Sequence, residues 1–209
     1  MRAQGYSYTS ISEKIKVSKS TLSNWLGALP YSPNQEMVEK MGRARVASGL
    51  AKNRLKLESL NQAHIEAVKD IGKLSQRDIF MLGIGLYIGE GTKTHDIVRV
   101  INSNPQVIRF AIRWFKESCG LSQSNFRLRL HVYPDTNIEK SIEFWSKATA
   151  IPKGQFQVAQ VDRRKDKKTV NKGKLPYGTA HLSMRSNGNK RFGRFFFRKI
   201  NAWIEEVLK

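Results

Sequence analysis

The chain has 209 residues, of which 37 are lysine or arginine and 17 are aspartate or glutamate, and its formal net charge at pH 7 is +20. A hydrophobic content of 40% argues against a disordered chain, and the single cysteine, Cys119, excludes an internal disulfide. No apolar run reaches the roughly 18 residues that a membrane span requires, and we expect a cytoplasmic protein.

The excess of positive charge gathers in the last quarter of the chain. Residues 151–209 contain 15 basic and 4 acidic residues, a net charge of +11 out of the total of +20. Such a surplus indicates a polyanionic partner, and nucleic acid is the partner that we expect. Two alternatives stay open here: binding to anionic lipid, and a basic composition that serves solubility only.

Residues 1–30 carry the pattern of two short helices joined by a tight turn. Leu22, Trp25 and Leu26 share one face of the second helix, and Ser18 is suited to cap its beginning. The remaining surface of that helix is polar. This favours a helix that contacts another molecule over one used for packing alone, although a packing hairpin remains an alternative.

This segment resembles the helix-turn-helix of resolvase-type bacterial regulators, with a first helix shortened to the few residues before Gly5. The resemblance implies that the helix from about Ser18 to Leu26 enters the major groove of DNA. The matching positions are Gly5-Tyr6-Ser7, Ile11, Val17-Ser18-Lys19-Ser20-Thr21 and Trp25-Leu26. The candidates for contact with bases or phosphates are Lys19, Ser20, Thr21, Ser23 and Asn24.

Residues 31–74 are predicted to form a helical linker. The sequence from about Gln35 to Asp70 favours helix, and Gly42 and Gly49 are candidate breaks or bends. Its apolar positions are sparse, which predicts a helix that bridges two domains and does not fill a core. Its basic residues suit either a phosphate backbone or a solvated surface, and they are Lys40, Arg43, Arg45, Lys52, Arg54 and Lys56.

The stretch from Leu82 to Lys93 is the most informative part of the chain. It is apolar for seven residues, carries Gly85 and Gly89, and ends in a single carboxylate, Glu90. A glycine inside a helix costs roughly 1 kcal/mol relative to alanine. We therefore expect Gly85 and Gly89 to form a smooth face on which another helix packs closely.

Beyond residue 74 helices and strands alternate, which predicts an α+β domain over residues 75–209. Ser75 caps a helix that runs to about Glu90, and Asn104-Pro105 begins the next one. Strands are predicted near 97–102, 126–133, 155–162 and 178–185, and further helices near 137–149 and from Ser186 to about 207. The strand at 126–133 alternates strictly between apolar and polar residues, as strands with one buried face do.

The run that ends at Gly91 resembles the LAGLIDADG motif of homing endonucleases. Gly85 matches its first glycine, Gly89 the small residue before the acid, and Glu90 the metal-binding acid, which is usually aspartate in that family. The order of elements over residues 75–209 is also close to that family's pattern. The resemblance implies that two such helices pack together, that their acids meet at a shared edge, and that the sheets form a saddle over DNA.

The polar side of the predicted strands supplies a basic surface. We expect an antiparallel sheet with helices on one face, which leaves the other face open, and a positive sheet can lie along a groove of DNA. The candidates there are Arg127, Arg129 and His131 from one strand and Thr179, His181, Ser183 and Arg185 from another. The connection between strands adds Arg163, Arg164, Lys165, Lys167, Lys168, Lys172 and Lys174, read as an arm on phosphates or, alternatively, as a solvated loop.

Glu90 is the candidate catalytic and metal-binding residue, with Lys93 as a second catalytic candidate. Phosphodiester cleavage needs clustered carboxylates around Mg²⁺, and the second half of the domain offers no matching acid. The LAGLIDADG resemblance implies a homodimer that supplies Glu90 twice. The alternative is a helix-end acid paired with Lys93 or an arginine. The four histidines are isolated in the sequence, which gives no zinc-ligand spacing.

The sequence thus predicts a site-specific double-stranded DNA-binding protein without a cofactor. A regulatory role fits, because a bacterial regulator family joins the same two modules without retained cleavage. The enzyme alternative is a Mg²⁺-dependent DNA endonuclease acting as a homodimer through Glu90. Binding to RNA or to the ribosome is a third possibility.

Overall fold

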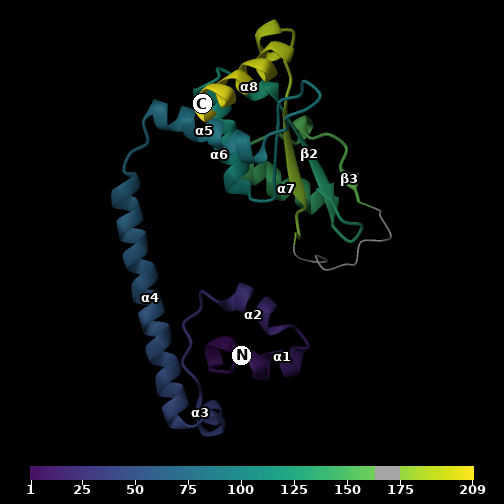
Figure 1. The fold of residues 1–209 in the computed structure, drawn as a ribbon. Coiled ribbons are helices and arrows are strands. Elements are labelled where there is room, and N and C mark those ends of the chain that lie inside the picture. The colour runs from purple at the N-terminus through teal and green to yellow at the C-terminus, as the bar shows by residue number, and fades with distance from the viewer. Residues whose placement is uncertain (163–174) are drawn as a thin grey trace. The chain divides into compact units, whose positions relative to one another are not determined.

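The chain forms two compact units, Met1–Gly72 and Lys73–Lys209 (Figure 1). The computed structural model describes residues 1–162 and 175–209. The first unit is helical in its described residues and the second combines helices with a sheet, so the predicted α+β class is confirmed. Among the described residues, no helix combines the length and the apolar character needed to cross a membrane.

The helical unit begins with short, well-capped helices. The side chains of Ser7, Ser18 and Asn34 each accept a hydrogen bond from the backbone N–H three residues later, which satisfies free donors in the first turn. Gly42, at φ +73°, ends one helix and precedes the next, as predicted, whereas Gly49 lies inside a continuous helix. The elements are a 3₁₀ turn Arg2–Gln4, α1 Tyr8–Ile15, α2 Lys19–Leu26, α3 Gln35–Met41 and α4 Arg43–Ile71.

The core of the helical unit is small and extends beyond residue 30. Ile11, Leu22 and Met37 are its buried apolar side chains. The Asn34 backbone N–H donates to the Gly5 carbonyl at 3.2 Å, and a Cβ at Gly5 would overlap that nitrogen, so only glycine allows this approach. Trp25, on the same side of α2 as the buried Leu22, is 65% exposed, because nothing described in this unit covers it.

The α/β unit contains one four-stranded sheet in the order β1-β4-β2-β3. β4 pairs antiparallel with both β1 and β2, whereas β2 and β3 are parallel, so the predicted antiparallel sheet is wrong at that edge. The helices are α5 Gln76–Glu90, α6 Pro105–Glu117, α7 Ile138–Thr149 and α8 Arg194–Leu208. The strands are β1 Arg99–Asn102, β2 Phe126–Val132, β3 Gln160–Val161 and β4 Thr179–Met184.

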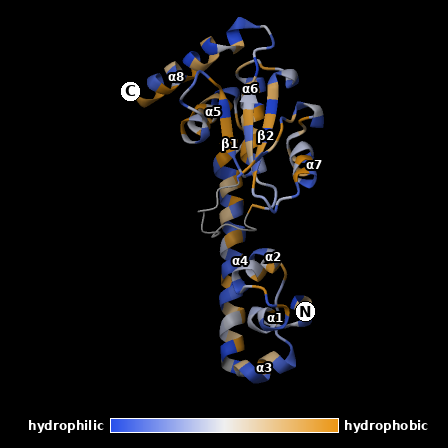
Figure 2. Cartoon of the chain, turned by 90° about the vertical axis from the view of Figure 1, so that its right-hand side faces the viewer, coloured by the Kyte–Doolittle hydropathy of each residue, from blue (hydrophilic) through white to orange (hydrophobic). Residues whose placement is uncertain are grey.

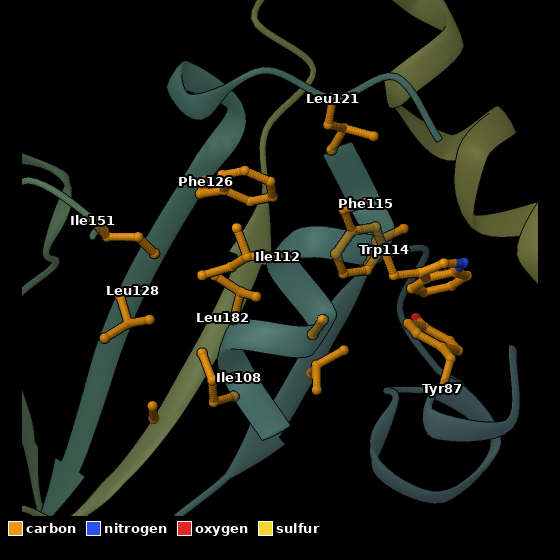
Figure 3. Close-up of a cluster of buried hydrophobic side chains, with 14 of the residues drawn as sticks. Tyr87, Ile108, Ile112, Trp114, Phe115, Leu121, Phe126, Leu128, Ile151 and Leu182 are labelled. Atoms are coloured by element: carbon orange, nitrogen blue, oxygen red, sulfur yellow. The ribbon is translucent and has the colours of Figure 1, made fainter. Parts of the chain in front are cut away.

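One face of this sheet is buried under helices. Ile108 and Ile112 of α6 face Leu182 of β4 and Leu128 of β2 (Figure 3), and all four side chains are buried. Every second residue of β2 is buried, so the predicted alternation is confirmed. The opposite set of side chains therefore points away from the core.

One strand and one helix have bounds that differ from those predicted from the sequence. The strand expected at 155–162 shrinks to Gln160–Val161, preceded by a 3₁₀ turn at Lys153–Gln155. The last helix starts at Arg194 and not at Ser186, because Asn187 and Gly188 both adopt positive φ values, which a right-handed helix does not tolerate.

Candidate nucleic-acid interface

The three longer strands bring the predicted polar residues together on one face. β4 lies in the middle, so Ser183 is opposite both Arg99 and Arg127, while His181 is opposite Arg129. All of these side chains lie on the side away from the core and are half-buried. We define the polar sheet face as Arg99, Arg127, Arg129, His131, Thr179, His181 and Ser183.

Arg99 is a member of this face that the sequence reading missed. Its Nε donates to the Ser183 Oγ at 3.0 Å, across the β1–β4 pair. The signal was present in the sequence: Val98 and Val100, on either side, are buried, so alternation places Arg99 on the polar side.

The two arginines of β2 differ in how they are held. Arg127 Nη1 donates to the carbonyls of Ser124 at 2.8 Å and Phe126 at 2.7 Å, which fixes its guanidinium beside the strand. Arg129 Nε is buried and has no acceptor within the described part of the chain. A buried donor without a partner is costly, so Arg129 is suited to receive an acceptor from a ligand.

His131 and His181, isolated in the sequence, stack at the centre of the polar sheet face. Their ring centroids are 3.6 Å apart and the planes differ by 11°. Burial, the neighbouring His131 ring and the charges of Arg99 and Arg129 lower the pKa of His181 to about 4. Burial, Arg129 and Arg99 also lower the pKa of His131, against a smaller opposite effect of Asp162.

Both imidazoles are therefore neutral at pH 7, and the positive charge of this face comes from its arginines. A neutral imidazole carries one donor and one acceptor nitrogen, which suits the mixed pattern of a base edge better than a phosphate. His181 Nδ1 is buried without a hydrogen-bond partner in the described residues. In this arrangement the arginines can contact anionic groups of a ligand, such as phosphates, and the imidazoles can form hydrogen bonds with the edges of nucleobases.

The remaining predicted contact residues of this unit fall at or beyond its edge. Arg185 follows β4 and is exposed, with its backbone N–H donating to the Asn125 carbonyl at 2.7 Å. The basic connection predicted as an arm, from Arg163 to Lys174, lies outside the described residues.

In the helical unit, α2 presents most of its predicted contact residues to solvent. Lys19, Ser20, Ser23 and Asn24 are exposed, while Thr21 is half-buried. The hydroxyls of Ser20 and Thr21 share hydrogen bonds with Ser18 Oγ, the N-cap oxygen, at 2.9 and 2.8 Å. Lys19, Ser23 and Asn24 are therefore the side chains of this helix best placed for a ligand.

The glycines of α5 do not share one environment. Gly83 is buried, and a Cβ there would overlap the Trp114 ring, so this glycine permits close packing of α5 on α6. Gly85 and Gly89, predicted as the packing positions, are exposed, and a Cβ at either would meet nothing within 4 Å. Their face, together with the half-exposed Leu82, is open in the single chain.

Glu90 lies at the exposed C-terminal end of α5, next to the outer edge of β1. The Gly91–Val100 bridge and a 2.9 Å hydrogen bond from Thr92 N–H to the Arg99 carbonyl attach this end to the sheet. Lys93 Nζ donates to the Ile88 carbonyl at 2.6 Å, where a cation offsets the negative end of a helix dipole. Lys93 thus caps α5 in this structure.

The described residues place no three His, Cys, Asp or Glu side chains where together they could hold a metal ion. The single carboxylate of Glu90 does not by itself match the several oxygen ligands that Mg²⁺ takes. Burial raises the pKa of the Cys119 thiol to about 12, which keeps it protonated and poorly nucleophilic.

Comparison of the chain with protein-family models, with curated proteins and with solved structures gave no match.

Proposed function

We propose that this protein binds double-stranded DNA with a sequence preference, through the polar sheet face and through α2. The observation that carries the proposal is the gathering of three arginines around a neutral, stacked histidine pair on the side of the sheet away from its core. The net charge of +20 supports a polyanionic partner. We further propose a regulatory role in the cytoplasm.

The chemistry of the polar sheet face fits a groove of duplex DNA. Arginine forms bidentate hydrogen bonds with phosphate or with the O6 and N7 atoms of guanine. The hydroxyls of Thr179 and Ser183 and the two imidazoles can donate to or accept from other base edges. A face with both kinds of group can gain affinity from charge and preference from the bases.

The helical unit supplies the second surface in this proposal. α1 and α2 are joined by a three-residue turn, Lys16 to Ser18, in which Lys16 has φ +56°. A turn of that length is typical of a helix-turn-helix, and the exposed side chains of α2 are then the ones that read the major groove.

The test is a binding-site selection from random duplexes with the full chain, with and without Mg²⁺. We expect one enriched sequence, and we expect the Ser23→Ala/Asn24→Ala variant to lose part of the enrichment. The matched control changes two polar residues of α1, Thr9→Ala/Ser12→Ala, and should keep it. Equal affinity for all duplexes, or a strong preference for structured RNA, would overturn the proposal.

The second candidate is a Mg²⁺-dependent endonuclease that acts as a homodimer through Glu90. The specific observation in its favour is the open face of Leu82, Gly85 and Gly89, which leads to the exposed Glu90. Pairing of two α5 helices would bring two Glu90 carboxylates to one edge. Nicking of a supercoiled plasmid that needs Mg²⁺ and is lost in Glu90→Gln would establish this activity, and intact plasmid would leave the protein a binding protein.

A further inference from the structure

The helix α4 is long, and within the helical unit most of its length is not covered by other described residues. It spans 29 residues, Arg43–Ile71, which corresponds to about 43 Å. Residues 47–71 are all exposed, and hydrophobic residues are interspersed with hydrophilic ones along the helix (Figure 2). Its exposed large apolar side chains are Leu50, Leu55, Leu57, Leu60, Ile65, Val68 and Ile71. A stable helix with this much exposed apolar surface indicates a missing partner.

Leu50, Leu57, Leu60 and Ile71 lie along one stripe with a seven-residue period, whereas Leu55, Ile65 and Val68 lie outside it. Leu50, Leu57, His64 and Ile71 follow one another at intervals of seven, and Val46, Asn53, Leu60 and Ala67 form a second such series. Each member of the second series precedes a member of the first by four residues. Alternating steps of three and four are the spacing of the a and d positions in a coiled coil. Leu55 lies on the opposite side of the helix.

We propose that α4 pairs with α4 of a second copy of this chain as an antiparallel coiled coil. In an antiparallel pair each a position meets a d position of the other helix. One register joins the whole stripe: Leu57 meets the partner's Leu60, Leu50 meets the partner's Ala67, and Val46 meets the partner's Ile71. This places four leucine side chains at the centre of the pair.

The polar residues of the stripe support the same register. Asn53 and His64 are its two polar members, and in this arrangement Asn53 lies opposite the partner's His64. The amide and the imidazole can form a hydrogen bond, so neither is left unsatisfied among apolar side chains. A parallel pair would instead place His64 against His64. Polar residues at such positions commonly fix the register and orientation of a coiled coil.

Charge complementarity also selects an antiparallel second copy. The first half of α4 contains Arg43, Arg45, Lys52, Arg54 and Lys56 and no acid. The second half contains Glu58, Glu66 and Asp70 with a single base, Lys69. Antiparallel pairing lays the basic half along the partner's acidic half, whereas parallel pairing lays basic along basic. DNA would match the basic half but would leave the apolar stripe uncovered.

Sedimentation analysis of the full chain over a dilution series tests the proposal. We expect a dimer for the natural sequence and self-association weakened about tenfold or more in Leu57→Glu/Leu60→Glu, because buried charges at the seam are strongly unfavourable. Leu55→Glu is the matched control, because Leu55 and Leu57 are similarly exposed, at 60% and 57%, but Leu55 lies outside the stripe. This variant should remain a dimer. A monomeric natural sequence overturns the proposal.

Disulfide trapping fixes the orientation and separates this dimer from one made through α5. In a Cys119→Ser background, a mixture of the Val46→Cys and Ile71→Cys proteins should form the mixed disulfide. Disulfides between two copies of the Val46→Cys protein, or between two copies of the Ile71→Cys protein, would show a parallel pair and contradict the proposal. A dimer that survives Leu57→Glu/Leu60→Glu but is lost in Gly85→Arg would mean that association runs through α5, and would also overturn it. None of these outcomes depends on DNA binding.

Discussion

The two units of this protein are stabilised in different ways. Among the described residues, the α/β unit buries twenty-two hydrophobic side chains in one cluster, including Trp114, Trp145 and Tyr87. The helical unit is about half as long but buries three, Ile11, Leu22 and Met37. It depends more on local contacts, such as its N-caps and the stacking of the Arg2 guanidinium on Tyr8 and Tyr31 at 4.0 and 3.7 Å.

This difference shows which surfaces are free to act. The α/β unit satisfies its own packing requirement on one face of the sheet, so the polar face is available for a ligand without loss of stability. The helical unit leaves Trp25 and the stripe of α4 exposed, which indicates that contact with other molecules completes it. In the account proposed above, the α/β unit is a scaffold with a binding face, and the helical unit depends on association.

Removal of the largest core side chain should show the strongest effect. We expect Trp114→Ala to lower the free energy of unfolding by about 3–5 kcal/mol, because Trp114 is fully buried between Gly83 of α5 and Phe115. Urea denaturation followed by circular dichroism measures the change. Trp25→Ala is the matched control, and its effect should stay within about 0.5 kcal/mol. Equal losses in both variants would remove the contrast between the units.

A smaller and local effect is expected in the helical unit. Leu22→Ala should cost about 2–4 kcal/mol of the stability of that unit, because Leu22 is one of its few buried side chains. Hydrogen exchange should then show faster exchange in α1–α3, while the amides of β2 and β4 keep their protection. Faster exchange throughout the sheet would show that the units do not fold separately.

The histidine pair makes a prediction about pH. The pKa of His181 is about 4 in the folded protein, below its ordinary value of 6.5. At pH values between these two, the imidazole of the unfolded chain is protonated more readily than that of the folded protein. Stability should therefore fall as the pH is lowered from 7 to 5, by about 1 kcal/mol after allowance for solvent screening at this half-exposed site. Denaturation of the natural sequence and of His181→Gln at both pH values measures it. A loss of the same size in His181→Gln would contradict this assignment.

The sequence predicted those features that depend on neighbouring residues. The caps at Ser18 and Ser75, the Asn104-Pro105 helix start and the alternation of β2 are all local patterns, and the structure confirms each. The length of β3 was predicted wrongly, because it depends on what pairs with that strand. The stacking of His131 on His181 depends on the register between β2 and β4, which residues 50 positions apart do not reveal.

The most direct test of DNA binding by the polar sheet face is the salt dependence of duplex affinity. Fluorescence anisotropy over a range of salt concentrations gives the slope of log affinity against log salt. The magnitude of this slope decreases by roughly 0.9 for each phosphate contact removed. We predict that Arg127→Ser/Arg129→Ser binds more weakly and has a slope smaller by up to about 1.8. The control Lys140→Ser/Lys147→Ser removes the same charge from exposed positions of α7, in the helical layer, and should match the natural sequence. Equal slopes and affinities for the two variants would contradict the assignment of this face as the DNA-binding surface.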